Sequence, residues 1–235
     1  MNKQSLLITA TDTDAGKTVL TSALVAYWYQ YHNPATLGLM KLMQTGVGDR
    51  ELYQQLFQLP PDITTPLVFD TPVAPPVAAQ QEGRTIDLGR IWQHLNQLQQ
   101  AKEFVLIEAL GGLGSPVTAE LTVADLAGEW RLQAILVVPV KLGAIGQTVA
   151  HVALARQAKI PLKGIVFNCT SLVSNEQLSQ WIPLDLIESL THVPVLGIIP
   201  YLSDPKDRKK LAQVAAQLDL ERLWGSQIVK SISAP

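Results

Sequence analysis

Thr9-Ala10-Thr11-Asp12-Thr13-Asp14-Ala15-Gly16-Lys17-Thr18 follows the apolar run 6–8 and precedes a segment with apolar residues at helical spacing. A strand, a loop ending in Gly-Lys-Thr and a helix together form the context of a phosphate-binding P-loop. The N–H groups of such a loop and the positive end of the helix attract anions. Lys17 is expected to neutralise the outer phosphates, and the Thr18 hydroxyl to bind magnesium. The stretch therefore predicts a nucleoside triphosphate site.

The composition is that of a folded chain with a weak net charge. Hydrophobic residues make up 47% of the 235 residues and charged residues 16%, which argues against extensive disorder. We expect a single domain over 1–235, with about 225–235 as a peripheral tail. A net charge of −2 does not fit the basic surface that nucleic-acid binding requires.

The same counts bear on where the protein works. The chain has one cysteine, Cys169, so it cannot form an internal disulfide. No apolar run reaches the roughly 18–20 residues that span a bilayer, and no signal peptide is expected at the N-terminus. We therefore expect a cytoplasmic protein without a membrane partner.

Continuous apolar runs alternate with helical patterns along the chain. Runs that are apolar throughout are typical of strands buried on both faces, and the predicted strands are 6–8, 36–40, 104–107, 134–140, 164–167 and 195–199. Helices are expected after the P-loop and over 50–59, 88–100, 123–130, 145–157, 177–190 (interrupted near Pro183) and 205–218. The proline-rich segment 64–83 is expected to be an extended loop. This order predicts an α/β fold of P-loop NTPase type, with a mainly parallel sheet covered by helices on both faces.

Polar residues stand where these strands end. Lys41, Glu108, Lys141 and Asn168 lie at or just after strand C-termini, as does the P-loop. Ligands of parallel sheets bind beyond that edge. We therefore expect these residues to share one rim of the molecule.

Two acids are candidates for a magnesium site with Thr18. Glu108 ends an apolar strand, where P-loop proteins place a second magnesium-directed group. Asp49 follows a glycine-containing turn, and helix capping is the simpler interpretation for that residue alone. Magnesium prefers oxygen ligands in octahedral geometry, which Thr18, Asp49 and Glu108 would suit. Lys41 either marks a strand end or acts as a partly desolvated ammonium beside the phosphates.

The ordered set of motifs resembles the dethiobiotin synthetase family. The resemblance runs from the first strand to about Leu202 and rests on Thr11-Asp12-Thr13-Asp14 before Gly16-Lys17-Thr18, Lys41 with Thr45-Gly46, Asp49, Glu108 with Gly111-Gly112, Pro72-Val73-Ala74-Pro75, Glu82-Gly83, Val140-Lys141-Leu142-Gly143, Asn168 and Gly197-Ile198-Ile199-Pro200. The family closes the ureido ring of dethiobiotin from 7,8-diaminopelargonate, carbon dioxide and ATP, with magnesium, in a homodimer. The P-loop alone is unspecific, whereas the ordered set is specific.

The resemblance implies a role for each matching residue. Lys41, Lys17 and Thr13 would be catalytic, and Thr13, Lys41, Thr45 and Gly111 would contact the diamine. Magnesium would be held by Thr18, Asp49 and Glu108. The nucleotide would be bound by these metal ligands and by Asp14, Ala15, Gly16, Lys17, Val19, Gly111, Asn168, Cys169, Pro200, Tyr201 and Leu202, with Asn168 at the adenine edge.

Some positions depart from the family pattern. These positions are Asp14, Leu42, Ala74, Ala109-Leu110 and Gly146. They bear on how the substrate fits and on which nucleotide is preferred. Asp14 stands where Glu is usual and shortens that side chain by one methylene.

Two other functions are open on the sequence. An amidoligase related to cobyrinate diamide synthase would need an additional glutaminase domain, for which 235 residues leave no room. A partitioning or positioning ATPase has a similar core but usually carries a lysine where Thr11 stands here. Dependence of ATP hydrolysis on the diamine separates the synthetase from both.

Overall fold

The computed structural model describes residues 4–225 and contains a six-stranded parallel sheet in the order β2-β5-β1-β6-β7-β8. Its strands are β1 (Gln4–Ala10), β2 (Leu37–Lys41), β5 (Phe104–Glu108), β6 (Gln133–Pro139), β7 (Leu162–Asn168) and β8 (Val195–Ile199). A second, two-stranded parallel sheet pairs β3 (Gln44–Thr45) with β4 (Val68–Phe69). The predicted α/β class and parallel sheet are confirmed.

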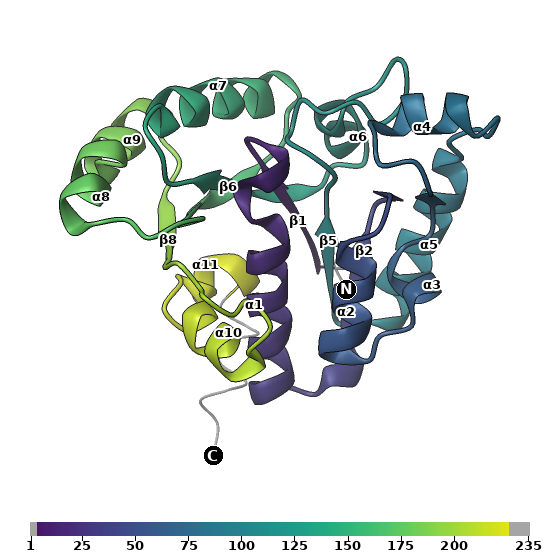
Figure 1. Ribbon diagram of the computed structural model, residues 1–235, viewed down its shortest axis with the longest axis horizontal. Coiled ribbons are helices and arrows are strands. Elements are labelled where there is room, and N and C mark those ends of the chain that lie inside the picture. Colours follow the sequence, from purple (N-terminus) through teal and green to yellow (C-terminus); the bar gives the residue numbers. More distant parts are fainter. Residues whose placement is uncertain (1–3, 226–235) are drawn as a thin grey trace.

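Helices cover both faces of the large sheet (Figure 1). In β1, Leu6 and Ile8 pack into a core with residues of α1, α2, α10 and α11, whereas Leu7 packs on the other side with residues of α4, α5 and α6. This alternation follows from the period of two in a strand. The helices are α1 (Lys17–Tyr31), α2 (Asp49–Phe57), α3 (Pro61–Thr64), α4 (Pro75–Gln81), α5 (Leu88–Ala101), α6 (Val123–Glu129), α7 (Ala144–Gln157), α8 (Asn175–Trp181), α9 (Leu184–Thr191), α10 (Arg208–Ala215) and α11 (Leu220–Trp224).

Strand register brings the predicted polar residues together. Lys41 and Glu108 are register partners at the ends of β2 and β5, and Ile8 of β1 pairs with Glu108 from the other side. The P-loop leaves β1 two residues after Ile8. The carboxyl ends of three adjacent strands therefore deliver the P-loop, Lys41 and Glu108 to one edge, as the strand-end rule predicts.

The segment 64–83 differs from its prediction. It was expected to be an extended loop, but it contains β4 and the helix α4, whose first two residues are Pro75 and Pro76. Proline fits the first turn of a helix, because the N–H that it lacks has no intrahelical acceptor there. Pro61 begins α3 in the same way, only four residues after α2 ends at Phe57. Pro61 and Pro75 are therefore helix starts, although prolines also indicate loops.

The other boundaries are close to those predicted. Pro183 separates α8 from α9 as expected, and α10 begins at Arg208 because the Asp207 side chain caps the N–H groups of Lys209 and Lys210. The short helix α11 was not predicted. Residues 226–235, most of the predicted tail, lie outside the described residues, and the single-domain assignment stays a prediction. Within 4–225, every helix is too short or too polar to cross a membrane.

Candidate active site

The P-loop reaches α1 through a turn that only glycine fits well. Residues Thr13–Ala15 form a 3-10 turn whose first N–H is capped by the Asp12 carboxylate at 2.7 Å. Gly16 then adopts φ +99°, a left-handed conformation that costs glycine little. A Cβ at Gly16 would lie 2.0 Å from Nδ2 of Asn168. Both the backbone conformation and the lack of space for a Cβ therefore require glycine at position 16.

Asn168 supports this turn from the end of β7. Its Nδ2 donates to the Ala15 carbonyl at 3.0 Å, and its side chain is buried. This contact was not foreseen, because the sequence places the two residues 153 positions apart. The predicted role of Asn168 at the adenine edge stays a prediction beside this structural one.

Lys17 lies against its own loop. Its ammonium donates to the carbonyl of Thr13 at 2.9 Å and to that of Asp12 at 3.2 Å. Burial lowers the pKa of Lys17, although the carboxylates of Glu108 and Asp49 oppose the shift. The charge is thus held by carbonyl dipoles of the loop before α1, and an incoming phosphate would replace these neutral partners.

Lys41 is buried between two carboxylates. Its ammonium contacts Asp49 Oδ2 and lies 3.1 Å from Glu108 Oε1. Burial lowers the pKa of Lys41, but Glu108 and Asp49 outweigh burial and hold the pKa above its usual value. Burial raises the pKa of Asp49, and Lys41 reverses that shift so that the carboxyl is ionised more easily. The interpretation of Asp49 as a helix cap is wrong, because Gly48 is the N-cap of α2 and the Asp49 carboxylate points to Lys41 and Thr18.

Thr18 completes the cluster from the first turn of α1. Its hydroxyl lies 2.8 Å from Asp49 Oδ1 and 3.0 Å from Glu108 Oε1. Adjacent ligands of an octahedral Mg²⁺ with bonds of about 2.0–2.1 Å are about 2.8–3.0 Å apart. The spacing of Thr18 from both carboxylates and the donor types of the predicted trio therefore fit magnesium.

Side chains that the sequence reading missed hold this cluster in place. The Tyr53 hydroxyl donates to Glu108 Oε2, and burial together with Glu108 raises the pKa of Tyr53 well above its usual value. Buried Gln44 accepts from the Arg50 N–H and donates to Gly46 O and Glu51 Oε2, which fixes the turn before α2. Helical spacing could have identified Tyr53, because it lies one turn after Asp49 on the same face.

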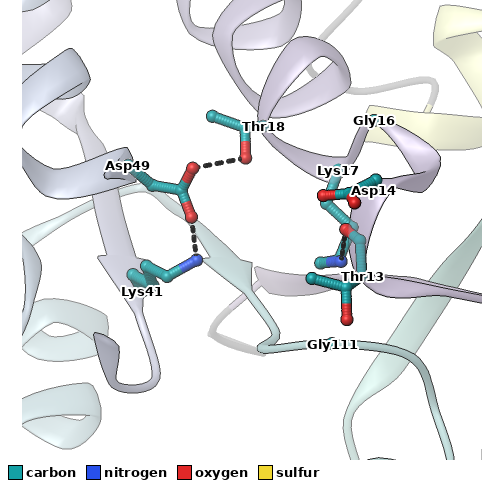
Figure 2. A pocket seen from close by; sticks show the side chains of 8 residues that line it. All are labelled: Thr13, Asp14, Gly16, Lys17, Thr18, Lys41, Asp49 and Gly111. Atoms are coloured by element: carbon teal, nitrogen blue, oxygen red, sulfur yellow. Dashed lines mark hydrogen bonds and ion pairs between the residues drawn. The ribbon is translucent and has the colours of Figure 1, made fainter. Parts of the chain in front are cut away.

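The P-loop, Lys41 and Asp49 line a pocket of about 300 Å³ at the strand-end edge (Figure 2). Figure 2 shows Lys41, Asp49 and Thr18 on one side of the pocket, with Thr13, Asp14, Gly16, Lys17 and Gly111 on the other. Its lining consists of Thr13, Asp14, Gly16, Lys17, Thr18, Lys41, Asp49 and Gly111, all of them predicted site residues.

Other predicted residues lie outside this lining. Glu108 is fully buried behind Lys41, and Thr45 ends β3 before the turn into α2. Tyr201 is exposed, whereas Cys169 and Leu202 are buried. The structure leaves the nucleotide or substrate roles of these residues, and those of Ala15, Val19 and Pro200, as predictions.

Comparison with known proteins identifies relatives that match almost the whole chain. The profile of a family described as "AAA domain" matches residues 4–209. An ATP-dependent dethiobiotin synthetase BioD of Gloeothece citriformis is 64% identical over 221 residues, which cover 93% of this chain and 98% of the relative. Its counterpart from Synechocystis is 55% identical, covering 95% and 96%. The counterpart from Bacillus subtilis is 28% identical, covering 94% and 97%.

Solved structures with the same fold belong to more distant proteins. The septum site-determining protein MinD of Pyrococcus horikoshii, complexed with Mg-ADP, has a TM-score of 0.57 at 16% identity, with 98% of each chain covered. A plasmid partition protein of Borrelia burgdorferi has a TM-score of 0.55 at 10% identity, covering 92% of this chain and 99% of that one. At this level of identity the likeness concerns the fold alone, which the partitioning ATPases share.

Proposed function

The chain belongs to the ATP-dependent dethiobiotin synthetase family, and from that premise we propose that its pocket converts 7,8-diaminopelargonate, carbon dioxide and ATP into dethiobiotin, ADP and phosphate. The observation that carries this proposal is the position of Lys41. Its ammonium lies in the same pocket as the P-loop but belongs to a different strand. A nucleotide switch needs the P-loop, whereas a second buried lysine serves an additional anionic reactant.

The P-loop side of the pocket binds the triphosphate. The Lys17 ammonium moves from the carbonyls of Asp12 and Thr13 to the outer phosphates. The N–H groups of residues 14–19 surround the phosphates of the nucleotide. The left-handed Gly16 lets the backbone approach closely.

The predicted metal ligands supply oxygens for magnesium. Thr18, Asp49 and Glu108 would hold the ion, which shields the phosphate charge when bound. The formal charge of the cluster is zero, because the two ammonium groups of Lys17 and Lys41 are balanced by the two carboxylates of Asp49 and Glu108. A triphosphate would therefore enter a cluster with no surplus positive charge, which supports the need for a divalent cation.

The chemistry then requires two anions to meet. One amine of the diamine combines with carbon dioxide and loses a proton, which gives a carbamate. A carbamate oxygen attacks the γ-phosphorus, and the bond to ADP breaks. Lys17 and Lys41 lie on two sides of this pocket and reduce the repulsion between the anions.

Ring closure follows on the same surface. The second amine attacks the carbamoyl carbon, a proton leaves that nitrogen, and the bond to phosphate breaks. Thr13 and Gly111 in the lining, and Thr45 beside it, are proposed to position the diamine. Most of the rate acceleration would come from positioning and from fixed charges.

The remaining assignments extend this proposal. Asn168, Cys169, Pro200, Tyr201 and Leu202 are assigned to the adenine end of the nucleotide. The protein is assigned to the cytoplasm, to which the single buried thiol of Cys169 lends support. A homodimer is proposed on the family resemblance.

The test is phosphate release with each reactant omitted in turn. We expect fast release only when ATP, Mg²⁺, bicarbonate and 7,8-diaminopelargonate are all present, with one dethiobiotin formed per phosphate. Release that does not depend on the diamine would contradict the proposed reaction and favour a switch-type ATPase.

A further inference from the structure

Tyr53 is a buried tyrosine that the proposed reaction does not use. It lies in α2 four residues after Asp49 and is fully shielded from solvent. Its hydroxyl donates to Glu108 Oε2 and also meets the Thr21 side chain, whose own hydroxyl donates to the Lys17 carbonyl at 2.9 Å. One side chain thus connects α2, β5 and the first turns of α1.

The two oxygens of the Glu108 carboxylate have separate partners. Oε1 faces Lys41 Nζ at 3.1 Å and Thr18 Oγ1 at 3.0 Å, which is the side of the predicted metal site. Oε2 accepts from Tyr53 on the other side. Glu108 is fully buried, so water cannot replace a lost partner at either oxygen.

We propose that Tyr53 is a positioning residue that restricts Glu108 to one metal-facing oxygen and thereby favours Mg²⁺ over Ca²⁺ at this site. The inference rests on the proposed function, because it assumes that Glu108 contributes to the metal site. Tyr53 itself is not part of the pocket lining.

The selectivity follows from the different coordination of the two ions. Mg²⁺ requires near-octahedral geometry with short bonds, whereas Ca²⁺ accepts six to eight oxygens and bidentate carboxylates. A carboxylate whose second oxygen is held by Tyr53 offers one ligand in a fixed direction. Without the hydroxyl, Oε2 has no donor, and rotation toward the cation would give both oxygens a partner. That bidentate arrangement suits Ca²⁺.

The test compares Tyr53→Phe with the parent by calorimetric titration of MgCl₂ and CaCl₂ into the ADP complex. Partners of a metal ligand typically contribute about 10- to 100-fold in metal affinity. We expect Mg²⁺ binding to weaken at least about 10-fold and Ca²⁺ binding to weaken less, so that the Mg²⁺/Ca²⁺ affinity ratio falls. Tyr27→Phe is the matched control, because Tyr27 is a buried tyrosine of α1 remote from Glu108, and its ratio should equal that of the parent.

Two further measurements separate the possible failures. A merely structural role would lower the melting temperature of Tyr53→Phe and leave the Mg²⁺/Ca²⁺ ratio unchanged, and that result overturns the inference. Glu108→Gln tests the premise. If this variant binds Mg²⁺ like the parent, the proposed metal site is wrong; if it loses Mg²⁺ while Tyr53→Phe keeps the parental ratio, only the role of Tyr53 is wrong.

A measurement on the parent decides the case in which Tyr53→Phe does not fold. Infrared difference spectra on adding Mg²⁺ to the ADP complex report the splitting of the carboxylate stretches. The bands absent from Glu108→Gln belong to Glu108. A monodentate splitting supports the inference, and a bidentate splitting overturns it.

Discussion

The two halves of the strand-end rim are built in different ways. At the ends of β1, β2 and β5, charged groups are buried and in direct contact, with Lys41 between Asp49 and Glu108. At the ends of β6, β7 and β8, the polar groups either face solvent or bind backbone. Lys141 is 45% exposed in its side chain and lies 3.8 Å from the exposed Asp12 carboxylate, whereas Asn168 donates to the P-loop.

The difference separates two tasks. A buried ion pair needs every member satisfied, so the first half is held rigidly by Thr18, Tyr53 and Glu108. In the second half, the Lys141–Asp12 ion pair is exposed, and Asn168 supports the P-loop through its hydrogen bond to the Ala15 carbonyl. We infer that the charged half binds the phosphates and carries the chemistry, and that the other half carries the fit of the rest of the nucleotide.

The largest effect is expected from Lys17→Ala. Removing the P-loop ammonium should lower turnover by on the order of 10³ or more, since it deletes one preorganised charge at the transferring phosphate. ATP affinity should fall by about 10- to 100-fold, because a hydrogen bond to a charged group contributes about 1.5–3 kcal/mol. Turnover and equilibrium ATP binding are to be measured on the same samples.

Lys163→Ala is the matched control for that change. Lys163 is also partly buried and donates to a backbone carbonyl, that of Leu223 at 3.3 Å, but it lies at the opposite end of β7. Its loss should leave ATP binding unchanged. Unchanged ATP affinity in Lys17→Ala would show that the P-loop assignment is wrong.

Glu108→Gln should have the next largest effect, on the magnesium requirement. The amide keeps the shape of the side chain but removes one carboxylate from Lys41 and Thr18. The Mg²⁺ concentration for half-maximal activity should rise at least about 10-fold. Glu188→Gln, which changes a carboxylate bonded to the Val195 N–H, is the control. A magnesium titration identical to that of the parent would remove Glu108 from the metal site.

Asn168→Leu should have the smallest effect of the three. It leaves the Ala15 carbonyl without its donor, which should destabilise the fold by about 1–3 kcal/mol and raise the KM for ATP with little change in kcat. Asn96→Leu removes a similar bond, to the Trp92 carbonyl, on an exposed helix face and should be nearly neutral. A large loss of kcat in Asn168→Leu would contradict the division between the two halves.

The charged half was also the more predictable one. The P-loop, Lys41 and Glu108 could be identified because each stands at a strand end or just beyond one, and parallel register brings such ends together. Asp49 was linked to the metal site by its carboxylate chemistry and by the family resemblance. The periodicity also located most of the helices. The helices that it missed are α3, α4 and α11. For α3 and α4 the reason is that proline favours both a loop and the first turn of a helix.

The specific hydrogen-bond partners of Tyr53 and Asn168 could not be predicted. Tyr53 meets Glu108 across 55 positions, and Asn168 meets Ala15 across 153. The first contact depends on how α2 packs on the sheet, and the second on how the end of β7 lies beside the P-loop. Helical spacing places Tyr53 on the same face as Asp49, but it does not identify Glu108 as the partner of Tyr53. Pattern and register thus indicate which groups converge, whereas the tertiary structure shows which of them hold the others in place.

The most direct test of the account compares two lysines of the same rim. Lys41→Met and Lys141→Met each delete one ammonium, the first buried and the second exposed. The rate of phosphate release with 7,8-diaminopelargonate and bicarbonate should fall by a factor of about 10²–10³ in Lys41→Met, while ATP affinity changes far less than in Lys17→Ala.

Lys41→Arg should not restore turnover, because a planar guanidinium places its charge differently from an ammonium. Lys141→Met should stay close to the parent, since an exposed ion pair contributes about 0–1 kcal/mol. A folded Lys41→Met protein that forms dethiobiotin at the parental rate would contradict the account.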